Sequence, residues 1–138
     1  MKYLIAAVLC LLGFMGRSQV YRFRAFEAHL GVVNDKREEI FNKNVWIESN
    51  ALVIIDLKDH KVDVYSDRET HLNLVQRESY QDDTDKLVLY YTAIDKDISE
   101  YKVTICTYKS KDDKFIGTLV IEDRSMKTVM IYHLKRDD

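Results

Sequence analysis

The sequence predicts an all-β domain, a single antiparallel meander of about eight or nine short strands. Apolar and polar residues alternate with period two along most of the chain, which is typical of strands with one buried face. Turns of only a few residues separate these stretches and are too short for the crossover helix that parallel strands need. The chain contains no proline, which fits a sheet whose backbone donors are nearly all used. Such a meander either closes as a small barrel or folds as a sandwich.

The N-terminal segment has the three-part pattern of a secretory signal peptide. A lysine stands at the second position, every residue from Leu4 to Leu12 is apolar, and small Gly16 and Ser18 precede a cleavage site. The apolar run is shorter than the roughly 20 residues that a spanning helix needs. We therefore expect residues 1–18 to be a signal peptide and residues 19–138 to be one β-rich domain. This domain would be exported, periplasmic or extracellular, with no stable membrane span.

The first strand is predicted from residues 21–25, where aromatic and small apolar side chains alternate with two arginines. We expect it to continue through a bulge, with Phe26, Ala28 and Leu30 on one face, and to end at Gly31. Next, Asp35 and Glu38 have the spacing of a capping box, which predicts at most one short helix near residues 35–43.

Alternation and β-branched residues predict eight further strands along the rest of the chain. They are residues 45–48, 51–57, 61–66, 71–76, 86–94, 100–109, 115–122 and 127–134. Residues 51–57 are apolar on both faces, so we expect this strand to be central and covered on both sides. Short polar turns join the strands, among them residues 58–60, 95–99 and 123–126.

The charge balance excludes one class of function. Lys2 and Arg17 belong to the leader, so 19 basic residues remain against 23 acidic ones, a net charge of −4. A nucleic-acid-binding protein needs a basic face that replaces counterions. We therefore expect no nucleic-acid partner.

The residues with catalytic or metal-binding chemistry form no recognisable motif. Asp95, Asp97 and Glu100 cluster in one turn, as ligands of a hard cation do, but the rest of an EF-hand loop is missing. Turn formation explains these residues equally well. Without Cys10 of the leader, Cys106 is the only cysteine, and its strand-like neighbours predict a buried, inert thiol. We expect no catalytic residue, no cofactor and no metal.

Aromatic residues give the candidate binding site. A closed sheet would turn some of its tyrosines inward, where they offer apolar rings with polar tips to a ligand. These aromatics can equally well fill the core. The candidate ligand-binding residues are Trp46, Tyr90, Tyr91, Tyr101 and Tyr132.

The order of several features along the chain resembles the order found in a group of other proteins. The resemblance rests on the leader, Trp46, Ile54-Ile55-Asp56, Val62-Asp63-Val64-Tyr65-Ser66, Ala93-Ile94-Asp95-Lys96-Asp97 and the terminal strand from Val129 to Leu134. This pattern resembles small exported proteins of unknown function from Gram-negative gut bacteria, some of which are compact, antiparallel, lipocalin-like barrels. The resemblance covers most of the mature chain and implies a barrel and export. It implies no activity and no catalytic residue.

We therefore expect a non-catalytic binding or interaction module for a small apolar ligand or a partner protein. Two alternatives stay open: a small extracytoplasmic hydrolase that uses paired carboxylates, and a structural component of the cell envelope. An open apolar barrel mouth would favour the ligand-binding module. A carboxylate buried in a cleft with a raised pKa would favour the hydrolase.

Overall fold

The computed structural model describes residues 20–34, 36, 39–66, 69–109 and 116–137, and for residues 39–49 it describes the backbone only. The predicted signal peptide, residues 1–18, lies outside the described residues. Among the residues described, no helix has the length and apolarity needed to cross a bilayer.

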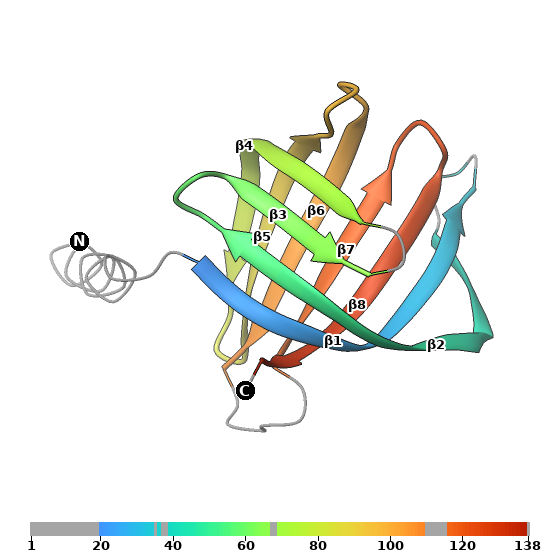
Figure 1. Ribbon diagram of the computed structural model, residues 1–138, viewed down its shortest axis with the longest axis horizontal. Coiled ribbons are helices and arrows are strands. Elements are labelled where there is room, and N and C mark those ends of the chain that lie inside the picture. The colour runs from blue at the N-terminus through green and yellow to red at the C-terminus, as the bar shows by residue number, and fades with distance from the viewer. Residues whose placement is uncertain (1–19, 35, 37–38, 67–68, 110–115, 138) are drawn as a thin grey trace, which may run out of the picture.

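Within the described residues, eight antiparallel strands form a closed barrel in which every strand pairs with its neighbours in sequence and β1 pairs with β8 (Figure 1). The strands are β1 (Val20–Val33), β2 (Glu39–Asp56), β3 (Lys61–Tyr65), β4 (Thr70–Asp82), β5 (Lys86–Ile94), β6 (Glu100–Tyr108), β7 (Gly117–Asp123) and β8 (Thr128–Arg136). The predicted all-β meander is thus confirmed, and it is a barrel and not a sandwich.

Two details near the N-terminus differ from the sequence prediction. The short helix expected near residues 35–43 is absent from residues 39–43, which belong to β2, while Asp35 and Glu38 lie outside the described residues. β2 also joins the two strands predicted at 45–48 and 51–57 into one. These residues are recruited into β2 because they pair with β1, a contact that local spacing does not reveal.

β1 confirms the predicted bulge but continues past Gly31. Its register shifts between Ala25 and Glu27, so that Ala25 and Ala28 both face the core, at 0% and 5% exposure. Gly31 does not end the strand, because it pairs with Phe41 on β2 and with Val129 on β8. The strand therefore runs two residues further than expected, to Val33.

One face of every strand builds the core, and this inner face alternates with an outer one. In β2, Val53 and Ile55 are 0% and 2% exposed, whereas Ile54 between them is only partly buried. The expectation that residues 51–57 are covered on both sides is therefore wrong. A closed barrel has one dry interior, so a strand that is apolar on both faces still turns one face outward.

Three turns share one local design. In each, an aspartate at the end of a strand accepts backbone N–H groups two to four residues later, with N···O distances of 2.9–3.2 Å. These aspartates are Asp56, Asp95 and Asp123. Each turn also contains a non-glycine residue at positive φ, namely His60, Ile98 and Lys127. Capping by the carboxylate stabilises turns that lack the glycine usual for this conformation.

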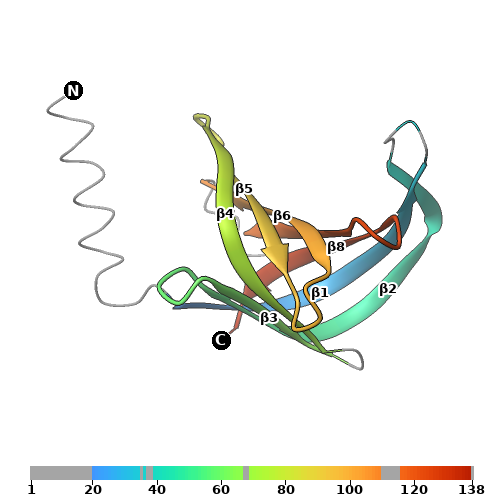
Figure 2. The same ribbon diagram turned by 90° about the horizontal axis from the view of Figure 1, so that it is seen from above.

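The short strand β3 leaves part of β4 at an edge. β3 pairs with β4 only at residues 70–73, so residues 75–82 have no neighbouring strand on that side among the residues described. Figure 2 shows the β4–β5 and β1–β2 hairpins rising on opposite sides of the molecule. Two register shifts against β5, around Val75 and Glu78, distort this edge. Such bulges, together with charged side chains, are features that protect edge strands from pairing with other chains.

Candidate functional site

The five candidate aromatic residues do not share one face. Tyr91, Tyr101 and Tyr132 belong to the inner face, where Tyr132 is 7% exposed within the core and the other two pack against it. Tyr90 pairs with Thr104 and Ser79 on the outer face, so it is not part of the same site. Trp46 lies opposite His29 in the register of β1 and β2, and its side chain lies outside the described part of the structure.

Two rows of paired residues place Tyr91 and Tyr101 on the inner face of one end of the barrel. In an antiparallel sheet, residues directly opposite each other project to the same side. The first row is Ala93, Tyr101, Asp123, Thr128 and Val32. The second row is Tyr91, Val103, Ile121, Met130 and Leu30. Ala93, Val103 and Ile121 are core residues, which identifies this side as the inner face.

Three chain segments meet at this end of the barrel. The β7–β8 turn contacts the start of β6, because the amide of Arg124 donates to the carbonyl of Glu100 at 3.2 Å. The side chains of these two residues also form an ion pair, with 3.0 Å between Nη1 of Arg124 and Oε1 of Glu100. The amide of Val33 at the end of β1 donates to the carbonyl of Lys127 at 2.7 Å. We call the inner-face residues Leu30, Val32, Tyr91, Tyr101, Asp123, Thr128 and Met130 at this end the mouth.

The mouth contains exposed apolar side chains on the face that elsewhere builds the core. Leu30 is 48% exposed and Val32 is 51% exposed, whereas Ile121 in the second row is 7% exposed. The sequence predicts Leu30 on the first strand but not in the site, and it predicts the end of the strand before Val32. The available signal was the alternation of Ala28, Leu30 and Val32, which continues through Gly31.

The polar groups of the mouth are oxygen atoms. The hydroxyl of Tyr101 donates to Oδ2 of Asp95 at 3.0 Å. Tyr101 also pairs with Asp123 across β6 and β7, so their side chains are neighbours on the inner face. Burial, the hydrogen bond to Asp95 and the charge of Asp123 raise the pKa of Tyr101 to about 12. The phenol is therefore neutral at physiological pH, and its hydroxyl donates its proton to the hydrogen bond with Asp95.

The basic residue Arg77 extends the second row beyond Tyr91. Arg77 on β4 pairs with Tyr91, and its guanidinium carbon lies 5.5 Å from the ring centre of exposed Tyr80. Burial raises the pKa of Tyr91, and the positive charge of Arg77 acts in the opposite direction. Carboxylates surround Tyr101, whereas Arg77 lies beside Tyr91, so the two tyrosines differ in their electrostatic surroundings.

Two of the residues predicted as a possible cation site, Asp95 and Glu100, have other partners. Oδ1 of Asp95 accepts the amides of Asp97 and Ser99, both at 2.9 Å, and Glu100 pairs with Arg124. Within the described ranges, no three His, Cys, Asp or Glu side chains are arranged to hold a metal ion. Asp95 thus caps the turn between β5 and β6, and Glu100 links the start of β6 to the β7–β8 turn.

Cys106 lies on the outer face and is partly exposed, so the prediction that it belongs to the core is wrong. Its neighbours Ile105 and Val103 do belong to the core, but alternation places Cys106 on the opposite side of β6 from Ile105. Burial raises the pKa of its thiol, although Lys86 acts in the opposite direction. A thiol with a raised pKa is a poor nucleophile at neutral pH.

Comparison with known proteins gives no match: no protein-family model, no curated protein and no solved structure is significantly similar to the chain.

Proposed function

We propose that this protein is a non-catalytic binding protein that takes a small apolar ligand at the mouth of its barrel after export from the cytoplasm. The observation that supports this proposal is the exposure of Leu30 and Val32, 48% and 51%, on the inner face. A bound ligand would remove these side chains from water, which contributes about 25 cal/mol for each Å² of apolar surface buried. Ligands of eight-stranded barrels commonly enter through such a mouth.

The tyrosines give the site both apolar and polar contacts. Tyr91 and Tyr101 are diagonal neighbours, since Tyr91 pairs with Val103 and Tyr101 pairs with Ala93. Their rings are partly buried against the core and supply flat apolar surface, while the hydroxyl of Tyr101 is held by Asp95. Such rigid aromatic side chains lose little conformational entropy when a ligand binds.

Titration with N-phenyl-1-naphthylamine, a neutral apolar fluorescent probe, tests the proposal. We expect saturable fluorescence enhancement by the wild-type protein. The double variant Leu30→Ser/Val32→Ser should bind the probe about tenfold more weakly, because it loses roughly 1.4 kcal/mol of apolar contact. Val75→Ser is the matched control, since Val75 is 61% exposed on β4 and does not belong to the mouth. Absence of saturable binding, or equal weakening by the control, would contradict the proposal.

A further inference from the structure

The charge distribution of the mouth points to the chemical class of its ligand, an inference that rests on the proposed function. The first row of the mouth contains Tyr101 and Asp123 as its charged or strongly polar members, with Ala93, Thr128 and Val32 beside them. No lysine, arginine or histidine occurs in this row. The polar end of a ligand here would therefore meet a carboxylate and a phenol.

The hydrogen bonds already formed leave acceptors at this position. Tyr101 uses its proton for Asp95, so its oxygen can only accept a bond from a ligand. Oδ1 of Asp123 accepts the amides of Ser125 and Met126 and the hydroxyl of Ser125, and an ionised carboxylate can only accept hydrogen bonds. A ligand head that brings hydrogen-bond donors is thus matched, whereas one that brings only acceptors is not.

The charges near the Tyr101 hydroxyl favour the same kind of ligand head as its hydrogen bonds do. The charged side chains that act on the Tyr101 hydroxyl are Asp95, Asp97 and Asp123, all of them acidic. Of the nearby cations, Arg124 pairs with Glu100, and Arg77 lies beside Tyr91 on β4, three strands from Asp123 on β7. An anionic head would be repelled at Tyr101, and a cationic head would be attracted.

We propose that the mouth takes a cationic amphiphile, whose apolar chain contacts Leu30, Val32 and Met130 and whose ammonium-type head lies against Asp123 and the oxygen of Tyr101. The apolar contacts supply most of the affinity, and the carboxylate selects the head. A fatty acid of the same chain length should bind less tightly, because its anionic head is repelled at this position.

Displacement of N-phenyl-1-naphthylamine by decylamine, decanol and decanoate, all below their critical micelle concentrations, tests the inference. The three share one chain and differ only in the charge of the head. We expect decylamine to displace the probe at a concentration about fivefold lower than decanol, as for a partly buried ion pair. Decanoate should be the weakest, and the preference for decylamine should shrink at high salt.

Asp123→Asn is the critical variant, because an asparagine keeps the Oδ1 acceptor that caps the turn and loses the charge. It should abolish the preference for decylamine, measured within the variant as the ratio of the displacing concentrations of decanol and decylamine. Asp59→Asn makes the same charge change in the exposed β2–β3 turn at the opposite end of the barrel and should keep the preference. Should Asp123→Asn fail to fold, the salt dependence of the wild-type protein decides.

The outcomes separate the two proposals. If decanoate displaces the probe as well as decylamine does, or if Asp123→Asn keeps the preference, the cationic ligand is wrong while the apolar binding site stands. If neither the probe nor any of the three amphiphiles binds, both proposals fail.

Discussion

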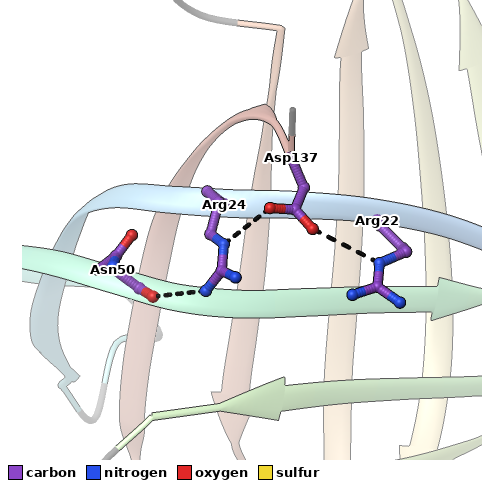
Figure 3. A network of polar contacts seen from close by, with 4 residues as sticks. All are labelled: Arg22, Arg24, Asn50 and Asp137. Carbon is purple, nitrogen blue, oxygen red and sulfur yellow. Dashed lines mark hydrogen bonds and ion pairs between the residues drawn. The ribbon is translucent and has the colours of Figure 1, made fainter.

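The Nε atom of Arg24 on β1 donates a 2.8 Å hydrogen bond to Oδ1 of Asp137, which follows β8 and lies 113 residues away in the sequence. Oδ2 of the same carboxylate lies 3.5 Å from Nε of Arg22, and Arg24 also donates to the carbonyl of Asn50 at 3.2 Å (Figure 3). Because the pairing of β1 with β8 closes the barrel, Asp137 ties together the first and last strands.

Loss of this contact should destabilise the closed barrel. We expect Asp137→Asn to lower the melting temperature at neutral pH by a few degrees, because both arginines lose their carboxylate. Asp59→Asn, in an exposed turn, should leave the melting temperature unchanged. Thermal unfolding followed by circular dichroism measures both, and an unaltered melting temperature for Asp137→Asn would show that the contact contributes nothing to stability.

The same contact has a defined pH dependence. The hydrogen bond from Arg24 lowers the pKa of the Asp137 carboxyl in the folded state. A depressed pKa gives stability that is present above the unfolded pKa of about 3.9 and is lost as the pH falls through the folded value. The difference in melting temperature between wild type and Asp137→Asn should therefore be constant from about pH 7 to 5 and should disappear as the pH falls below the lowered pKa of Asp137 in the folded state.

His71 should show the opposite pH dependence. Its Nδ1 lies 2.7 Å from Oδ1 of Asp63 and its Nε2 lies 3.0 Å from Glu69, contacts that raise the pKa of the imidazole. A raised pKa gives stability that is complete below the unfolded value of about 6.5 and is lost as the pH rises through the folded value.

We therefore expect His71→Gln to cost less than about 1 kcal/mol near pH 5, since His71 is well exposed, and nothing near pH 9. Urea unfolding at the two pH values measures this difference, and titration of the ring protons by NMR gives the pKa directly. A pKa at or below the ordinary histidine value would refute the assignment.

Gly117 has no space for a side chain. A Cβ atom at this position would overlap the backbone carbonyl oxygen of Cys106 on the neighbouring strand β6. Since backbone must move to relieve the overlap, Gly117→Ala should destabilise the protein by about 1–3 kcal/mol. Thr118→Ala, the next residue on the partly exposed outer face, is the control and should cost less than half as much. Equal losses in chemical denaturation would contradict the close approach.

Neighbouring residues on β2 should respond very differently to a charge. Val53 is 0% exposed on the inner face, so Val53→Asp should prevent folding, because an unpaired buried charge costs several kcal/mol of a total of about 5–15. Ile54 is partly exposed on the outer face, between Arg22 and Asp63 in the register, so Ile54→Asp should leave a folded protein. If the two substitutions changed the circular dichroism spectrum to the same extent, this register would be contradicted.

The sequence determined the class of this fold because strand formation leaves a local signal. Period-two alternation marked strands such as residues 86–94 and 100–109, and the structure has β5 and β6 almost at those bounds. Short links allowed only antiparallel neighbours. The aspartates at 95 and 123 marked turns, since a carboxylate can cap the backbone within a few residues.

The tertiary structure alone decided closure and the composition of the site. Tyr90 and Tyr91 look equivalent in a strand that is apolar on both faces, and only pairing with Thr104 and Val103 assigns them to opposite sides. Leu30 and Val32 became candidates because β1 pairs with β8 at the open end of the barrel. Closure depends on contacts between residues more than a hundred positions apart, whose pairing no local periodicity encodes.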